Sequence, residues 1–402
     1  MKTRMLIPIC LLLVACASES PTEEVRELTV QEKEVAKANT AFGLALLKEI
    51  HSAEANGNLL LSPLSVSMAL GMTLNGAAAT TYDAMRNTLA FDATSQHEIN
   101  TAYSGLLRQL RARDSKIEIG IANSLWFNNG FPVFPAFVDT VRHYFEAEIR
   151  QLDFSSSSSP ATISQWAEQK TAGRIKNLIT QIQADEIMFL VNAVYFKAPW
   201  TTVFSESSTR DAPFRRPDGS TVTARIMSND ASYNSVKKDG IQAVELLYGD
   251  SAFSMVLVSA DQGVSLAPAV ALLQRDKWDA LITSMQPGRL MLSIPKFKFT
   301  YEKTLKDALT ALGMGIAFDE RRADFTRIAD VRPENLYISR VQHKTFIDVH
   351  EKGTEAAGAT AVGIGVTSLP PELKFDRPFL FAIRERSTGT LLFVGRVVDP
   401  TK

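Results

Sequence analysis

Cysteine is almost absent from this sequence. The 402 residues include two cysteines, Cys10 and Cys16, and both lie within the first sixteen positions. The rest of the chain has no thiol and cannot form an internal disulfide, so its stability must come from packing. With 45% hydrophobic residues, the chain has enough apolar material for a sizeable core.

The residue patterns of common catalytic and binding sites are also missing. The five histidines show no paired metal-ligand spacing, and no glycine-rich loop opens a helix as a phosphate cradle. Lys and Arg are scattered over a chain of net charge −1. Gly249-Asp250-Ser251 resembles the start of a hydrolase motif but lacks the downstream Asp-x-x-His. We therefore predict no catalytic residues, metal, cofactor or nucleic-acid partner.

The N-terminus has the pattern of a targeting segment. Lys2 and Arg4 precede an apolar run from Met5 to Val14 that is too short to span a bilayer and is typical of a secretory signal. Leu13-Val14-Ala15-Cys16 resembles the bacterial lipobox, in which the cysteine is acylated and becomes the first residue. The alternative is an ordinary signal peptide with an incidental cysteine.

These features predict three parts. Residues 1–15 are a lipoprotein signal peptide, residues 16–29 are the lipidated Cys16 with a flexible tether, and residues 30–402 are a single domain, because no Pro/Gly-rich linker divides them. Ala17 follows the cysteine where inner-membrane retention signals carry Asp. We expect an exported protein anchored to the outer membrane or cell surface of a bacterium.

Periodicity predicts an α+β fold. Helices are expected at residues 30–51, 63–75, 80–89, 98–113, 134–145, 163–179, 266–285 and 301–312. Strands are expected at residues 189–196, 254–259, 289–299, 341–349, 379–384 and 391–397. Thr80 and Asp83 have the spacing of a capping box for the third helix.

One segment has an unusual composition. Glu351 to Pro371 is long, small and weakly polar, and it lies between two expected strands. With a period of two, one face reads Thr, Ala, Gly, Thr, Val, Ile from Thr354 to Ile364. Such a segment could be exposed at one time and become a strand at another. By composition alone, a flexible Ala/Gly loop is the simpler interpretation.

Several motifs in order give this sequence a family resemblance. Glu351 to Ala359 matches, at every position, the Glu-x-Gly-Thr-Glu-Ala-Ala-Gly-Ala hinge of the reactive-centre loop of serpins. The segments Asn58 to Asn75, Ala122 to Trp126, Val191 to Trp200 and Phe375 to Pro400 are similar to further serpin motifs. The chain thus resembles a serpin from about residue 35 to Thr401.

The resemblance implies a fold and a function. The fold would be helices packed around three mostly antiparallel β-sheets, with an exposed reactive-centre loop at about residues 351–371. The function would be suicide inhibition: a serine protease attacks the loop and forms an acyl-enzyme, and the cut loop inserts into the central sheet. The protein would act as a monomer, its partner being the protease, and inhibition of cysteine proteases is also compatible with the family.

The resemblance also assigns roles to residues. The hinge, at the start of the loop, is Glu351, Gly353, Thr354, Ala356, Ala357, Gly358 and Ala359. The shutter, where the two central strands part, is Ser62, Ser65, Asn192 and His343. The breach, where the loop enters the sheet, is Trp200, Lys296 and Glu351. The family's spacing from Glu351 places the reactive bond at Thr367-Ser368, with Val366-Thr367 as the alternative. We expect Thr354 to lie at the mouth of the sheet, where a larger side chain could stay in water.

The loop sequence bears on specificity and on a competing function. From Gly353 to Pro371 there is no Lys, Arg, Phe, Tyr, Trp or Met, which favours elastase-like or broad subtilisin-like targets. The alternative function is a non-inhibitory, tethered binding or chaperone-like lipoprotein with a serpin fold. The small hinge residues argue against it, because non-inhibitory relatives usually carry bulky, charged or Pro residues there.

The anchoring prediction has a direct test. Cys16→Ser removes the acylated thiol, so the variant should leave the membrane fraction while its inhibitory activity stays unchanged, because the tether lies outside the folded domain. Fractionation of cells followed by a protease assay measures both effects. Persistent membrane association of the variant would contradict the lipobox interpretation.

Overall fold

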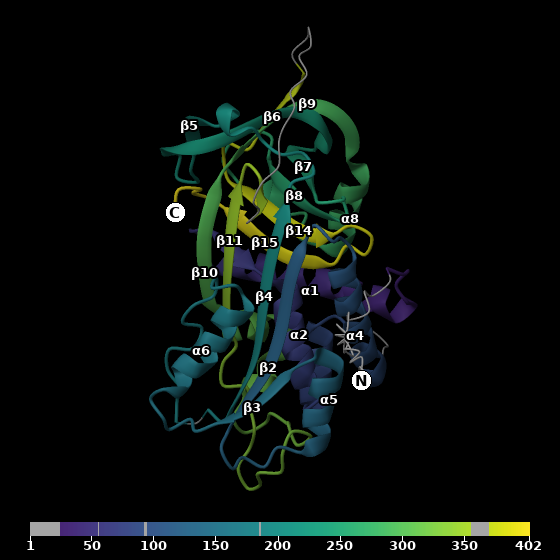
Figure 1. Ribbon diagram of the computed structural model, residues 1–402, viewed down its shortest axis with the longest axis vertical. Coiled ribbons are helices and arrows are strands. Elements are labelled where there is room, and N and C mark those ends of the chain that lie inside the picture. The colour runs from purple at the N-terminus through teal and green to yellow at the C-terminus, as the bar shows by residue number, and fades with distance from the viewer. Residues whose placement is uncertain (1–24, 55, 92–94, 185, 355–369) are drawn as a thin grey trace, which may run out of the picture.

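Two β-sheets organise the chain, and helices pack against them (Figure 1). The computed structural model describes residues 25–54, 56–91, 95–184, 186–354 and 370–402. Side chains from both sheets pack into one large hydrophobic cluster.

The long vertical strands of Figure 1 form the six-stranded sheet. Its order is β10 (Phe297–Thr304), β11 (Gln342–His350), β12 (Gly353–Thr354), β4 (Met188–Pro199), β2 (Glu118–Asn128) and β3 (Glu148–Leu152). All neighbouring pairs are antiparallel except β2 and β3, which are parallel.

The second sheet has nine strands. The order is β1 (Leu59–Leu61), β15 (Leu391–Val397), β14 (Phe379–Glu385), β8 (Phe253–Ala260), β7 (Ile241–Tyr248), β6 (Thr221–Lys238), β9 (Gln286–Pro295) and β13 (Glu372–Lys374), with β5 (Arg210–Arg215) paired to β6. The first and last strands of the chain meet here, because Leu59 lies opposite Arg396 and Leu61 opposite Val394.

The long strand β6 explains why the ladders form two sheets where the resemblance implied three. Its residues 234–238 pair with β7, and its residues 226–235 pair with β9. One strand therefore belongs to two groups of strands and joins them into a continuous sheet. The α+β class and the packing of helices around the sheets are confirmed, whereas most of the expected exposed loop, residues 355–369, lies outside the described residues.

Helices pack against both sheets: α2 and α6 contact β4 of the six-stranded sheet, and α7 contacts β8 of the nine-stranded sheet. They are α1 (Val30–Ala53), α2 (Pro63–Leu74), α3 (Ala79–Thr88), α4 (Gln96–Ala112), α5 (Pro135–Phe145), α6 (Ser159–Lys170), α7 (Ala267–Val270), α8 (Arg275–Ser284) and α9 (Lys306–Leu309). Short single turns follow at η1 (Glu206–Ser208), η2 (Thr310–Met314) and η3 (Gly315–Phe318).

Packed structure begins before α1. Thr29 caps the helix in a reciprocal capping box with Glu32, and the Glu32 carboxylate also binds Arg26 at 2.5 Å. Leu28 is buried. The C-terminal part of the segment expected to be a flexible tether therefore rests on the domain.

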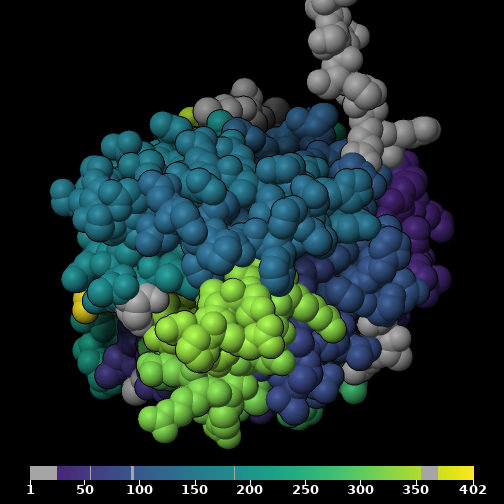
Figure 2. Space-filling model, turned by 90° about the horizontal axis from the view of Figure 1, so that it is seen from below, coloured from purple at the N-terminus to yellow at the C-terminus, as the bar shows by residue number. Residues whose placement is uncertain are grey.

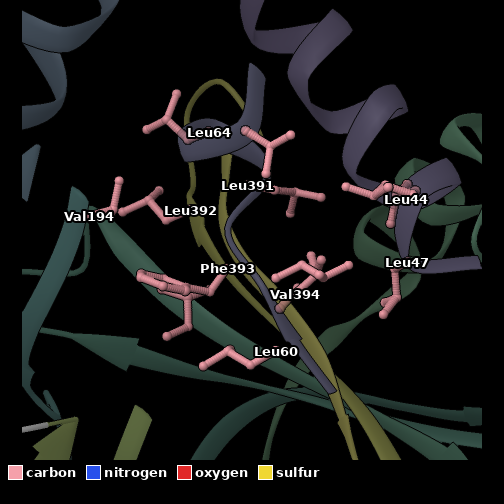
Figure 3. Packing of buried hydrophobic residues seen from close by; sticks show 14 of the residues in the cluster. Leu44, Leu47, Leu60, Leu64, Val194, Leu391, Leu392, Phe393 and Val394 are labelled. Atoms are coloured by element: carbon pink, nitrogen blue, oxygen red, sulfur yellow. The ribbon is translucent and has the colours of Figure 1, made fainter. Parts of the chain in front are cut away.

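Both faces of β4 are buried. Val194, Phe196 and Ala198 point into the large cluster, while Phe189, Val191 and Ala193 belong to a smaller cluster beneath α6. Figure 3 shows part of the large cluster, with side chains from α1, α2, β1, β4 and β15: Leu44, Leu47, Leu60, Leu64, Val194, Leu391, Leu392, Phe393 and Val394. Burial on two sides explains why β4 reads as a nearly continuous apolar run.

Several boundaries differ from the sequence predictions. The helix expected to reach residue 179 ends at Lys170, because Ala172 and Gly173 have positive φ angles of 48° and 81°. Residues 301–304 belong to β10, where the alternation of Phe297, Phe299 and Tyr301 fixes a strand period. The capping box expected from Thr80 and Asp83 is wrong: the N-cap of α3 is Ala78, which has no side-chain cap, and Thr80 lies inside the helix.

Candidate functional site

The strand β12 lies between β11 and β4 and pairs with both. After β11, the residues Glu351 and Lys352 turn the chain back, and Gly353 and Thr354 form the short strand. Thr354 lies opposite Val349 on one side and opposite Ala198 on the other. In the part of the chain that the structure describes, no ladder joins β4 directly to β11.

Gly353 fits a position that no other residue could occupy. Its φ is +147°, and a Cβ at this position would lie 2.1 Å from the carbonyl oxygen of Ala198. The backbone of β12 therefore approaches β4 closely, and the hinge glycine has a steric reason.

Thr354 is inside the sheet. Its side chain is 3% exposed, and its hydroxyl lies 2.6 Å from the hydroxyl of Tyr248. Tyr248 in turn stacks on Trp200, with ring centroids 4.3 Å apart and planes inclined by 13°. The expectation that Thr354 lies at a mouth with room for a larger side chain is wrong, because its site is already closed.

The three breach residues meet where the chain turns into β12. Nζ of Lys296 lies 2.8 Å from Oε2 of Glu351, and Oγ1 of Thr209 donates to Oε1 of Glu351 at 2.8 Å. Burial alone would raise the pKa of Glu351, but the bonds from Lys296 and Thr209 outweigh it and leave the pKa below its usual value. Nε1 of Trp200 donates to the carbonyl of His350 at 2.9 Å.

Below β12, the described residues of β4 and β11 form no ladder with each other, and this part of the sheet is called the gap. Three of the four residues assigned to the shutter lie together beside it. Ser62 caps α2, with its hydroxyl accepting from the amide of Ser65 at 3.3 Å. The amide of Ser62 donates to Nε2 of His343 at 3.2 Å, so the imidazole is a neutral acceptor at this nitrogen. Burial lowers the pKa of His343 to about 4.

Asn192, the fourth shutter residue, has a different partner. Its Nδ2 donates to Oδ1 of Asn123 at 2.6 Å, and Nδ2 of Asn123 donates to the carbonyl of Phe145 at 2.6 Å. Oδ1 of Asn192 is buried and has no hydrogen-bond partner. Asn192, His343 and Ser65 all line one cavity of about 130 Å³ whose lining comes from β4, β11, α2 and the segments before the two strands.

The geometry can be compared with known proteins. The family described as Serpin (serine protease inhibitor) matches residues 37–400. The chain belongs to the serpin family. It is 32% identical to neuroserpin of Gallus gallus over 394 residues, which covers 94% of this chain and 92% of that protein.

Two solved serpin structures have the same fold. The thermophilic serpin tengpin in its native state superposes with a TM-score of 0.83 at 30% identity, covering 94% of this chain and 96% of tengpin. Human thyroxine-binding globulin complexed with thyroxine gives 0.85 at 28% identity, covering 92% of this chain and all of that one. The fold is thus shared with a protein that binds thyroxine.

Some residues assigned from the serpin resemblance lie outside the described part of the chain. These are the hinge residues Ala356, Ala357, Gly358 and Ala359, the reactive-bond residues Val366, Thr367 and Ser368, and Cys16. Within the described ranges, no group of three or more His, Cys, Asp or Glu residues is placed to hold a metal ion. Gly249-Asp250-Ser251 forms the turn between β7 and β8, where Asp250 pairs with Lys116.

Four further residues of this serpin's site were not found from the sequence. Tyr248, Thr209 and Asn123 each bond to a named hinge, breach or shutter residue. Thr345 donates to the carbonyl of Leu60 at 2.8 Å, on the same face of β11 as His343. Thr345 had a signal in its spacing of two from His343, and Asn123 lies in the motif from Ala122 to Trp126. Tyr248 and Thr209 come from segments distant in the sequence and had no signal.

The buried imidazole of His343 predicts a pH dependence. Its pKa in the folded protein, about 4, lies below the ordinary value of 6.5, so the unfolded state binds the proton more readily. Stability should therefore be intact above about pH 6.5 and should fall by about 2 kcal/mol on going down to about pH 5. His343→Gln keeps an acceptor without this proton and should flatten the profile.

Thermal denaturation midpoints over this pH range test the prediction. His143→Gln, at an exposed histidine, is the matched control and should keep the parent profile. An unchanged slope in His343→Gln would show that His343 is not the titrating group.

The buried position of Thr354 predicts the outcome of two substitutions. Thr354→Arg forces a guanidinium into a closed apolar site, so β12 should leave the sheet, and the uncut protein should melt at a lower temperature. Thr354→Val keeps the shape but leaves the Tyr248 hydroxyl without its partner, at a cost of about 1–3 kcal/mol. Melting curves give both values; an arginine variant that melts like the parent would contradict the closed site.

Proposed function

We propose that this serpin is a suicide inhibitor of serine proteases that acts by inserting its reactive-centre loop into the six-stranded sheet. The observation that carries the proposal is β12. Two residues of the loop's N-terminal side already pair with β4 and β11, while these neighbouring strands are twelve and nine residues long. The sheet therefore contains the start of a strand that a freed loop would continue.

The register of β12 supports the proposal further. If the same pairing continues, Thr360 lies opposite both Asn192 and His343. Alternation places Thr360 on the inward face together with Thr354. A threonine hydroxyl would then arrive beside the amide oxygen of Asn192, which is buried without a partner. The loop sequence and the polar groups along the gap are thus complementary.

The chemistry belongs to the protease, and the inhibitor supplies the movement. The protease serine attacks the carbonyl carbon of Thr367, the bond to Ser368 breaks, and the new amine of Ser368 leaves with a proton. An acyl-enzyme remains on Thr367. Insertion competes with hydrolysis of this ester, and its driving force is backbone pairing and burial that the uncut protein has not made.

The proposed specificity rests on the loop's small side chains. Elastase-like and broad subtilisin-like proteases accept residues such as Val366 and Thr367, whereas trypsin-like proteases read Lys or Arg, which the loop lacks. Cysteine proteases also form acyl-enzymes and are included among the candidate targets.

A non-inhibitory binding function is the second candidate. The similarity to thyroxine-binding globulin favours it, because that serpin's structure holds a hormone. The two functions make opposite demands on the gap between β4 and β11. An inhibitor must accept a complete new strand there, and a carrier need not.

We also propose that the protein is exported and held at a bacterial outer membrane or cell surface by acylated Cys16. The support is the N-terminal sequence. None of the helices in the described residues is long and apolar enough to cross a bilayer.

The decisive experiment is incubation with an elastase-like protease, analysed by denaturing electrophoresis. We expect a covalent complex that resists SDS, and none with trypsin through this loop. Cleavage at Thr367 should also raise the thermal denaturation midpoint sharply, because the inserted strand completes two ladders. A cleaved protein with the parent's midpoint and no covalent complex would favour the binding function.

A further inference from the structure

A buried ion pair joins the lower ends of the two strands that border the gap. Arg340 lies just before β11, and Glu186 lies just before β4. Nη2 of Arg340 donates to Oε2 of Glu186 at 3.2 Å, and Nε lies 2.7 Å from Oε1 without a hydrogen bond to it. The side chain of Glu186 is 1% exposed and that of Arg340 is 24% exposed.

Both side chains are also fixed by their own surroundings. The Glu186 carboxylate accepts from the amide of Gln183 at 2.7 Å. The Arg340 guanidinium donates to the carbonyl of Gln181 at 2.7 Å and lies over the ring of Phe189, 5.4 Å from its centroid. Arg340 therefore ties the segment before β11 to the segment before β4.

The ion pair lies at the end of the six-stranded sheet opposite β12, because Glu186 precedes β4 and β12 pairs with the last two residues of β4. Figure 2 shows the molecule from that end. The yellow-green segment that leads into β11 lies against the blue and teal part of the chain, which includes β2 to α6. Glu186 and Arg340 also line the cavity that contains the shutter residues Asn192 and His343. The ion pair thus lies below the shutter along the same gap.

The register of β12 predicts that a fully inserting loop would run into the Glu186–Arg340 ion pair. Continued pairing places residue 363 opposite Arg340 and residue 366 opposite Glu186. A loop that inserts fully must bring its last residues between these two side chains. The first part of the loop, down to about residue 361, would stop above them.

We propose that the Glu186–Arg340 pair is a latch that slows the last part of loop insertion and holds the uncut sheet closed at its base. The inference rests on the proposed inhibitory function. Separating a buried carboxylate from its guanidinium is costly, so the latch adds a barrier that the shutter and breach do not. Neutralising both partners together removes the attraction without leaving a lone buried charge.

Synthetic peptides can separate the latch from the rest of the gap. A short peptide of residues 355–361 ends above the ion pair, and a long peptide of residues 355–367 passes between its two side chains. Glu186→Gln combined with Arg340→Gln should speed incorporation of the long peptide into the uncut protein by about tenfold. Incorporation of the short peptide should keep the parent's rate.

A matched control comes from the other side of β11. Lys298 and Asp348 form an ion pair of 2.9 Å between β10 and β11, which stay neighbours during insertion. Lys298→Gln should leave the rates of both peptides unchanged. Circular dichroism verifies folding, and Glu186→Gln alone provides the same comparison if the double variant misfolds.

The outcomes distinguish the latch from the proposed function. If the parent takes up neither peptide and gains no stability on cleavage, the inhibitory function fails and the latch fails with it. If the parent takes up both, but the double variant takes up the long peptide at the parent's rate, the latch alone is overturned. An equal acceleration of both peptides also overturns it, because the sheet would then be loosened as a whole.

Discussion

The two ladders of β12 are the constraint on which the rest of this structure depends. The two described residues of β12 pair with neighbours of nine and twelve residues on both sides, so they set the register for any residue that follows them between these strands. Gly353 packs closely against Ala198 and Thr354 is buried, and these two contacts fix the register at the start of β12. Every later residue of an inserting loop would inherit that register, because strand pairing admits no slip of one residue without reversing the faces.

The polar groups along the gap follow a common rule. His343 accepts from the amide of Ser62 at the start of α2, the amide nitrogen of Asn192 donates to Asn123 on β2, and Thr354 bonds to Tyr248 on β7. Each of these bonds stays on one side of the gap, whereas Oδ1 of Asn192 has no partner. The two central strands can then separate without exposing these groups to an apolar interior. Glu186 and Arg340 depart from the rule, because their attraction crosses from one strand's base to the other.

The sequence predicted the α+β class and most long helices, and the motifs pointed to residues that lie close together in the structure, such as Lys296 with Glu351 and Ser62 with His343. Those predictions rest on local periodicity and on motifs, which survive folding. It failed where the local pattern was ambiguous: residues 301–304 fit a helix until the alternation of buried Phe297, Phe299 and Tyr301 is seen. It could not find Tyr248, Thr209 or Arg340, because a contact between distant strands leaves no spacing in the chain.

The pairing of β1 with β15 determines when the fold can be completed. Leu59–Leu61 lie near the start of the domain and their partners, residues 394–396, lie near its end. In the nine-stranded sheet β15 sits between β1 and β14, so the sheet is incomplete until residues 391–397 have left the ribosome. Contacts of such long sequence separation form slowly. Until then the apolar strand β1 lacks its partner, and its buried surface in the finished fold is open to chaperones or to aggregation.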